Sequence, residues 1–319
     1  MDASQVKQFA KDCGADLVGI ASMDRFEGAP KQMDPRWIFP DAKAMVVMGF
    51  RILRGALRGV EEGTFFVGYS GMGYAGINTI LQPMVLWEFC KGLEDRGYEA
   101  VPIPNNFSWS AIHATGNEEE IGRPRPEWSR PVSPDRPAPD VFFSLRIAAF
   151  CAGLGEIGWS KMLLTPVFGP RQRLAAVMTD LPLEPDPLYD GPALCDRCML
   201  CAKDCSVSAI PSEASVKVTV AGRDLEWADI DYTKCSVGFC GGDREHNPFM
   251  LTDDEEAGFN QHPYGRAQNF KLHPQNGYGR ALEGAKGCIR ACMLHLEQQG
   301  KLSNTFVNPF RRRPPWRLA

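Results

Sequence analysis

Residues 194–210 read LCDRCMLCAKDCSVSAI and hold four cysteines, Cys195, Cys198, Cys201 and Cys205, in the spacing C-x2-C-x2-C-x3-C. This spacing is typical of bacterial ferredoxins, in which three thiolates of a run ligate one [4Fe-4S] cluster and the fourth ligates a second cluster. Structural zinc sites usually pair two short cysteine units across a longer gap, so the compact run favours iron over zinc. The segment therefore predicts a ferredoxin-like fold with two [4Fe-4S] clusters.

The remaining cluster ligands are expected farther along the chain, because two such clusters need about eight thiolates. Residues 287–293, GCIRACM, keep the last C-x3-C of a second run, whose final cysteine would ligate the other cluster. A full second run would place another cysteine at position 285, where this chain has Ala285, and we assign that ligand position to Cys240 instead. The predicted ligands are Cys195, Cys198, Cys201 and Cys292 for cluster one, and Cys205, Cys235, Cys240 and Cys288 for cluster two. The other cysteines, Cys13, Cys90 and Cys151, fit apolar helical faces as small buried side chains.

Composition indicates an ordinary globular protein. The chain has 319 residues, of which 44% are hydrophobic and 23% charged, and its net charge is -4. The acidic balance counts against a polyanion such as tRNA as a partner. The longest apolar stretch, residues 44–50, is far shorter than the roughly 20 residues that span a bilayer, and the first thirty residues show no signal peptide. We therefore expect a cytoplasmic protein without a membrane segment, in which clustered thiols bind metal rather than form disulfides.

Alternating helices and strands predict an α/β (α+β) first domain. A short helix capped by Ser4 precedes a strand at 17–20, and further strands are expected at 45–50, 98–103 and 173–181. A long helix over 77–93 should be kinked by Pro83 and stopped by Gly97. The Pro-rich residues 182–192 mark the domain junction. We predict a domain at 1–185, a cluster domain at 186–300 with an insertion at 241–279, and a tail at 301–319.

The glycines of residues 152–158, AGLGEIG, have GxGxxG spacing and raise the question of a dinucleotide site. A Rossmann unit needs a strand before these glycines and a long helix after them. Here residues 146–151 look helical, and Pro166, Gly169 and Pro170 would break a helix in the segment after the glycines. The context therefore argues against a dinucleotide.

The longer segment 152–187, AGLGEIGWSKMLLTPVFGPRQRLAAVMTDLPLEPDP, resembles the shared core of the corrinoid-dependent reductive dehalogenases and the epoxyqueuosine reductases. The resemblance extends loosely over residues 1–210 and again around 235 and 288–292. Glu156 and residues 169–177 are more similar to the dehalogenase branch, whereas the short chain without an export signal is more similar to the epoxyqueuosine branch.

The resemblance implies a nitroreductase-like corrinoid-binding domain, followed by the double-cluster domain, that seats cobalamin beside the substrate. Electrons would pass from an external donor such as ferredoxin or flavodoxin through both clusters to the corrinoid, which does the bond breaking. A flavin is the alternative acceptor in such a domain.

The resemblance also implies candidate site residues. A proton donor or substrate contact is expected at Tyr74, at Asn105 or Asn106, and at Asp140, which stands one position from the place of the aspartate in epoxyqueuosine reductases. The competing interpretations are a tyrosine packed in the core and turn asparagines that bond their own backbone. Arg146 is either a phosphate or propionate partner or a paired structural arginine. The candidate cofactor-binding residues are Arg146, Gly153, Leu154, Gly155, Gly158 and Thr165.

These observations predict a cluster-containing reductase that cleaves a bond in a small organic substrate. Epoxyqueuosine reduction on tRNA is the first alternative, and it requires a basic RNA-binding surface. A non-catalytic electron carrier or corrinoid activator is the second alternative.

Overall fold

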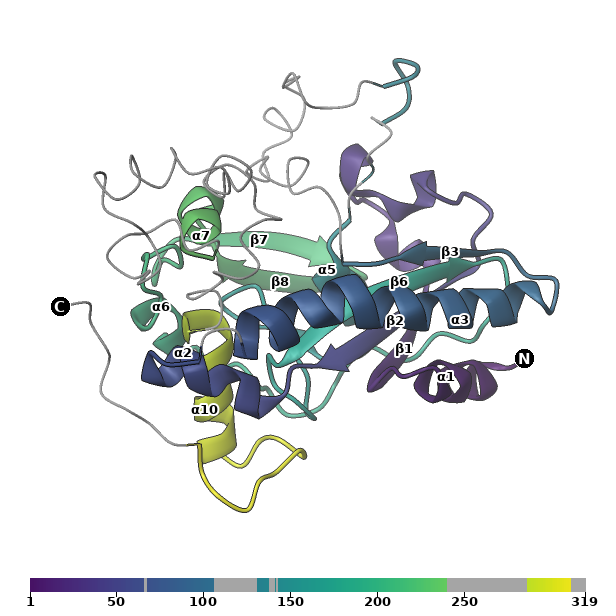
Figure 1. The fold of residues 1–319 in the computed structure, drawn as a ribbon. Helices are drawn as coiled ribbons and strands as arrows, with labels where there is room; N and C mark the ends of the chain where they lie inside the picture. Colours follow the sequence, from purple (N-terminus) through teal and green to yellow (C-terminus); the bar gives the residue numbers. More distant parts are fainter. Residues whose placement is uncertain (66–67, 106–130, 138–140, 142, 240–285, 311–319) are drawn as a thin grey trace, which may run out of the picture.

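The computed structural model describes residues 1–65, 68–105, 131–137, 141, 143–239 and 286–310 (Figure 1). Three predicted site residues, Asn106, Asp140 and Cys240, lie outside the described residues, as does the predicted insertion at 241–279.

The chain begins with helix α1 (Ala3–Asp12), which leads into strand β1 (Leu17–Ser22). Asp2, rather than the predicted Ser4, caps α1: the Asp2 side chain accepts the Gln5 N–H, and the Gln5 side chain accepts the Asp2 N–H. This reciprocal capping box satisfies two N–H groups that have no partner within the helix. Ser4 lies too late in the sequence to cap, because it is already inside the helix.

One four-stranded sheet forms the centre of the molecule, in the order β1-β2-β6-β3. The strands that join β1 are β2 (Ala44–Arg51), β6 (Gln172–Thr179) and β3 (Ala100–Ile103). All three pairings are antiparallel, and in the central pair Val47 lies opposite Ala176. The mixture of helices and sheet predicted from the sequence is confirmed, and the antiparallel pairing makes it α+β rather than a parallel α/β sheet.

Helices cover both faces of this sheet, which is why its central strands are apolar on both sides. On one face, Val46 and Met48 share a core with Val6 of α1 and Phe89 of α3 (Gln82–Glu94). On the other face, Met45 and Val47 pack with Ala148 and Ala149 of α5 (Leu145–Cys151) and with Met178.

Helix α3 follows two π-helical segments, η5 (Gly68–Ala75) and η6 (Ile77–Leu81). Pro83 lies where η6 passes directly into α3, and Leu81 and Gln82 before it have right-handed helical backbone, so the kink at Pro83 stays a prediction. Gly97 follows the end of α3 with φ of +82°, a conformation that glycine adopts without strain.

The second half contains α6 (Leu200–Lys203), a hairpin of β7 (Ser215–Val220) and β8 (Arg223–Ala228), α7 (Tyr232–Phe239), η9 (Lys286–Ala291) and α10 (Cys292–Gln298). Sequence analysis did not predict the hairpin. The core on the α1 and α3 face includes Leu181 and Leu183 together with Leu194, Met293 and Leu296. Apolar packing therefore continues across the predicted domain junction.

Shorter elements complete the fold: η1 (Met23–Phe26), η2 (Lys31–Met33), η3 (Pro35–Trp37), η4 (Arg54–Leu57), α2 (Arg58–Glu62), β4 (Glu156–Ile157) and β5 (Leu163–Leu164). Among the described residues, no helix has the length and hydrophobicity needed to cross a membrane.

The turn before the β4–β5 hairpin tolerates only glycine at position 155. A Cβ at Gly155 would lie 1.9 Å from the backbone oxygen of Leu164, which pairs with Glu156 across the hairpin. We expect Gly155→Ala to lower the free energy of unfolding by roughly 1–3 kcal/mol because backbone must move to make room. Gly55→Ala is the control, since a Cβ there meets nothing within 4 Å. Chemical denaturation measures both variants, and equal stabilities would contradict the packing argument.

Candidate functional site

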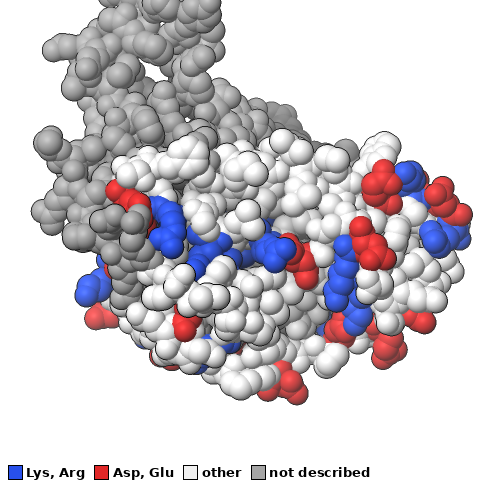
Figure 2. Space-filling model, turned by 60° about the horizontal axis from the view of Figure 1, so that its bottom comes forward, with Lys and Arg blue, Asp and Glu red and all other residues white. Residues whose placement is uncertain are grey.

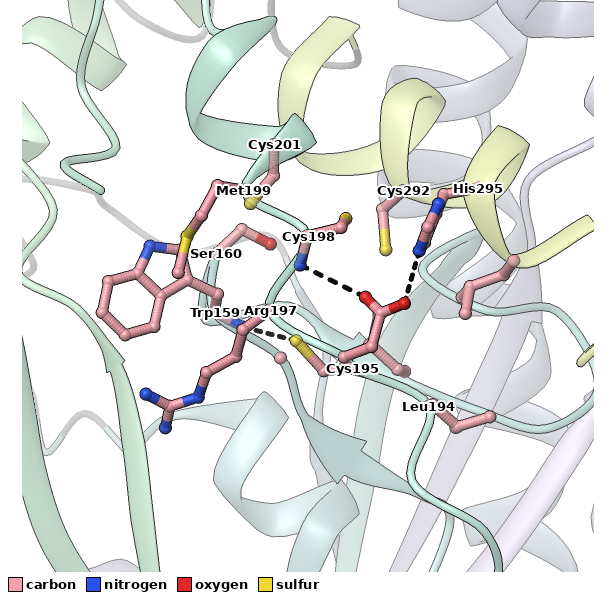
Figure 3. Close-up of a pocket in the computed structure, with 14 residues that line it drawn as sticks. Trp159, Ser160, Leu194, Cys195, Arg197, Cys198, Met199, Cys201, Cys292 and His295 are labelled. Atoms are coloured by element: carbon pink, nitrogen blue, oxygen red, sulfur yellow. Dashed lines mark hydrogen bonds and ion pairs between the residues drawn. The ribbon is translucent and has the colours of Figure 1, made fainter. Parts of the chain in front are cut away.

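Four cysteines converge on one pocket beside α6 (Figure 3). Cys195 and Cys198 come from the loop before α6, Cys201 comes from α6 itself, and Cys292 is the first residue of α10. All four line the pocket, and their sulfur atoms surround a shared space in Figure 3. The structure thus brings together the set that the spacing assigned to cluster one. Cys198 is the exposed member and Cys201 is buried.

The loop reaches this shape through two residues with left-handed backbone, Arg197 (φ 56°) and Met199 (φ 58°). Such conformations are uncommon for residues other than glycine. They turn the chain twice within a short stretch, so the loop wraps around the pocket before α6 begins.

A second group of cysteines lies near η5, within electrostatic reach of Tyr69 in that segment. Cys205 follows α6, Cys235 lies on α7, and Cys288 lies on η9. Burial, followed by the nearby thiols of Cys235 and Cys205, raises the pKa of Cys288 to about 12, whereas the Arg146 guanidinium opposes this shift. Three of the four residues predicted for cluster two are therefore close together, and Arg146 faces them.

The most buried thiols of both groups are predominantly protonated at neutral pH without a bound cation. Burial raises the pKa of Cys201 to about 11 and raises the pKa of Cys292 well above its usual value. A metal bound by these residues must displace their protons, and it must stabilise several thiolates in a poorly solvated space. Thiolate sets of this kind suit iron–sulfur clusters.

Backbone N–H groups point at sulfur in both groups. The Trp159 N–H donates to Cys195 Sγ at 3.4 Å, and the Ala209 N–H donates to Cys205 Sγ at 3.3 Å. Hydrogen bonds to cluster sulfurs stabilise the thiolate form and tune reduction potentials. The first group thus offers the four thiolates that one [4Fe-4S] cluster needs, and the second group offers three among the described residues.

Close backbone contact between η9 and α6 holds the two groups together. A Cβ at Gly287 would lie 2.6 Å from the Cys201 backbone oxygen and 2.9 Å from the Cys205 nitrogen. Arg290 pairs with Asp204 at 3.2 Å and with Glu61 of α2 at 2.9 Å. Because Arg290 stands between Cys288 and Cys292, this ion pair network anchors both cysteines to α6 and α2.

A hydrogen-bond network closes the outer side of the first pocket. Asp196 accepts the Cys198 N–H at 3.2 Å, and its other oxygen lies 2.7 Å from both His295 Nε2 and Gln299 Nε2. Partial burial opposes ionisation, but the hydrogen bonds from His295 and Gln299 hold the pKa of Asp196 below its usual value. The ligand atoms of Asp196, Cys198 and His295 lie within 4.8 Å of one another. Sequence analysis missed this network, since a single histidine carries no spacing signal.

Tyr74 of η5 is almost fully buried and packs against α7, the helix that carries Cys235. Its ring meets Phe239 of α7 edge-on at 4.7 Å between centroids, and the Arg173 guanidinium lies 4.3 Å from the ring centroid. Arg173 also donates to the Tyr69 hydroxyl at 2.6 Å. Sequence analysis identified Tyr74 but neither Arg173 nor Tyr69, because no local pattern marks a partner on a distant strand.

Buried polar side chains continue from Tyr74 along the same helical segment. Asn78 and Gln82 follow at four-residue intervals and are 1% and 0% exposed. Gln82 accepts the Asn105 N–H at 3.1 Å, so this stripe connects Tyr74 with the start of the loop that carries Asn105. The Asn78 Oδ1 atom has no hydrogen-bond partner among the described residues.

The structure places the predicted cofactor-binding residues of segment 152–165 in contact with protein. Cβ atoms at Gly153 and Gly155 would collide with the backbone oxygens of Pro187 and Leu164. Leu154 packs on the core near α5. The buried Thr165 hydroxyl donates to Gln172 and accepts the Phe168 N–H. Gly158 borders the first pocket, and Arg146 donates to the Lys161 backbone oxygen at 3.3 Å.

Charges on the described surface are mixed. On the face shown in Figure 2, several basic side chains lie in a row across the middle of the described surface, and acidic side chains lie at both ends of this row.

Sequence comparison finds reductive dehalogenases. The chain is 42% identical over 85 residues to a tetrachloroethene reductive dehalogenase of Dehalobacter restrictus, covering 26% of this chain and 15% of that protein. It is 37% identical over 105 residues to the enzyme of the same name from Sulfurospirillum multivorans, covering 28% and 20%. No protein-family model matches the chain.

Structural comparison agrees on the fold. A catabolic reductive dehalogenase solved with 3-bromo-4-hydroxybenzoic acid matches with a TM-score of 0.51 at 18% identity, covering 98% of this chain and 41% of that chain. A reductive dehalogenase solved to explain B12-dependent dehalogenation matches with the same values. An epoxyqueuosine reductase from Streptococcus thermophilus matches with a TM-score of 0.46 at 16% identity, covering 83% and 67%. A segment of about a quarter of the chain is thus similar in sequence to reductive dehalogenases, in agreement with the predicted resemblance, and the chain spans less than half of the length of these relatives.

The close approach at Gly287 generates a prediction for metal content. We expect Gly287→Ala to reduce the iron bound per chain, because its Cβ would push η9 away from the Cys201 and Cys205 backbone. Iron analysis and the visible spectrum of anaerobically reconstituted protein measure the loss. Gly55→Ala is again the control, and full iron content in Gly287→Ala would show that η9 does not need this contact.

Proposed function

We propose that this chain is a cytoplasmic, cobalamin-dependent iron–sulfur oxidoreductase that reductively cleaves a bond in a small organic substrate, with removal of a halide as the nearest chemistry. The observation that carries this proposal is the convergence of Cys195, Cys198, Cys201 and Cys292 on one pocket, with Cys205, Cys235 and Cys288 beside it. Homology to reductive dehalogenases supports the reaction class.

The arrangement of the two groups supports an electron path. Cluster one would include the exposed Cys198, so a donor such as ferredoxin or flavodoxin would meet the protein there. Cluster two would lie farther inside, near Arg146, Tyr69 and Tyr74, with Cys240 as its fourth ligand. We propose that electrons enter at cluster one and leave at cluster two toward the η5 wall.

The described residues near cluster two fit a corrinoid. The corrinoid would supply the cobalt centre that breaks the substrate bond. The Asn78 Oδ1 atom has no hydrogen-bond partner among the described residues, so it could accept a hydrogen bond from an amide group of the corrinoid. The polar side chains beside it, Tyr74 and Gln82, are also buried. Arg146, which faces the cysteines of cluster two, would offer a cation to an anionic group. Gly153, Leu154, Gly155, Gly158 and Thr165 would support this seat through the packing of their loop.

The chain would supply the proton at Tyr74. Arg173 lies over the Tyr74 ring and also donates to the Tyr69 hydroxyl, so it holds the Tyr74 ring in place. Asn105, which follows β3, would contact the substrate, with Asn106 and Asp140 as further candidates. A buried wall of this kind also excludes water from the reacting atoms.

Reconstitution tests the cofactor content directly. The anaerobically purified chain, supplied with iron, sulfide and hydroxocobalamin and then desalted, should retain about eight irons and about one cobalt. Iron without cobalt would indicate an electron carrier or a flavin protein, and a colourless protein would contradict the proposal. If cobalt is retained, a tRNA-binding assay at several salt concentrations separates the small-molecule enzyme from an epoxyqueuosine reductase.

Removing one ligand should remove one cluster. We expect Cys292→Ser to lose about half of the bound iron, because cluster one would lose its only ligand on α10. Iron analysis and electron paramagnetic resonance of the reduced protein measure the effect. Cys13→Ser, outside both groups, should keep the full iron content. Full iron in Cys292→Ser would exclude this residue as a ligand.

Removing the Tyr74 hydroxyl should slow turnover without changing cofactor content. We expect Tyr74→Phe to lower kcat for dehalogenation by roughly 10²–10⁴-fold, which is the usual contribution of a general acid. Phenylalanine preserves the ring contact with Phe239. Tyr189→Phe, whose hydroxyl donates to Pro192 on the surface, is the matched control and should keep wild-type kcat. Equal rates in both variants would exclude Tyr74 as the donor.

A further inference from the structure

The loop at 153–159, whose glycines have GxGxxG spacing, contacts the cysteine run at 195–205. Its residues have no direct part in the proposed reaction. Its glycines pack against backbone oxygens of Pro187 and Leu164, which leaves no space there for a phosphate. A Cβ at Gly158 would lie 3.7 Å from Cys195 Sγ, so the loop ends directly against the first ligand of cluster one. In Figure 3, Trp159 and Cys195 are joined by the N–H to sulfur contact.

Two residues of this loop hold Cys195 from both ends. Glu156 Oε1 accepts the N–H of Cys195 at 2.5 Å and the N–H of Leu194 at 2.9 Å. The Trp159 N–H donates to Cys195 Sγ at 3.4 Å. Glu156 of β4 thus holds the backbone of Cys195, and Trp159 in the turn after β4 holds its sulfur.

The Glu156 carboxylate has no basic partner among the described residues, where its hydrogen bonds go to these two backbone amides. Leu194 is 3% exposed, so loss of the carboxylate would leave a buried N–H without its acceptor. Hydrogen bonds from N–H groups to an ionised acceptor are also stronger than those to a neutral one. An ionised Glu156 would therefore place a negative charge beside Cys195, with these two amides as its described partners.

We propose that Glu156 is a positioning residue for cluster one, with two separable effects. Its oxygen sets the backbone of Cys195 so that the thiolate faces the pocket, and its charge lowers the reduction potential of cluster one relative to cluster two. The second effect follows because a nearby negative charge disfavours the addition of an electron. This inference rests on the proposed function, since it requires a cluster at this pocket.

Two substitutions separate position from charge. Glu156→Gln keeps an amide oxygen as acceptor and removes the charge, whereas Glu156→Ala removes both. The full chain is reconstituted anaerobically with iron and sulfide, its iron is counted, and both clusters are titrated by electron paramagnetic resonance. Glu99→Gln is the matched control, because Glu99 is an exposed carboxylate at the start of β3.

We expect Glu156→Gln to keep all its iron and to shift one of the two midpoint potentials upward, with the other unchanged. Glu156→Ala should lose up to half of the iron, and Glu99→Gln should match wild type. Unchanged potentials in Glu156→Gln, or an equal shift of both, would overturn the inference while leaving the two-cluster assignment intact. A wild-type chain without iron would instead overturn the proposed function itself. Circular dichroism of Glu156→Gln verifies its fold, so the test does not depend on the alanine variant.

Discussion

The convergence of the cysteines depends on the contact between α6 and η9. Cys288 and Cys292 are distant in sequence from the run at 195–205, and they reach it only because Gly287 lets two backbones approach to a distance that a side chain would forbid. Arg290, placed between these two cysteines, adds ion pairs to Asp204 and Glu61. The absence of a side chain at Gly287 thus allows Cys288 and Cys292 to reach the cysteines of residues 195–205.

The central sheet supports the segments that carry the cysteines. Strands β2 and β6 are buried along nearly their whole length, and helices pack on both of their faces. The β4–β5 hairpin follows α5, and Glu156 of this hairpin reaches the amide of Cys195. Strand β6 carries Arg173, which reaches Tyr69 and Tyr74. Neighbouring segments of one framework therefore position both the proposed point of electron entry and the proposed proton donor.

The segment AGLGEIGW shows how one pattern permits two interpretations. Its glycine spacing is that of a dinucleotide loop, but each glycine is present because another part of the chain packs against it. Spacing alone cannot distinguish a glycine that admits a ligand from one that admits a neighbouring carbonyl. The helix predicted before the glycines is confirmed, because α5 precedes them.

The amino-acid pattern alone was enough to predict the strands of the central sheet and the residue types of the site. Strong apolar runs identified β1, β2, β3 and β6, since local burial patterns survive in a single sequence. The spacing of Cys195, Cys198 and Cys201 predicted a cluster-binding loop, because ligands on one short loop must follow its geometry. The antiparallel strand order could be read only from the folded chain. The same holds for the position of Arg146 beside the second cysteine group and for the contacts of Glu156 with Cys195 and of Arg173 with Tyr69. Those contacts join residues far apart in the chain, and no local pattern records which distant segment a side chain will meet.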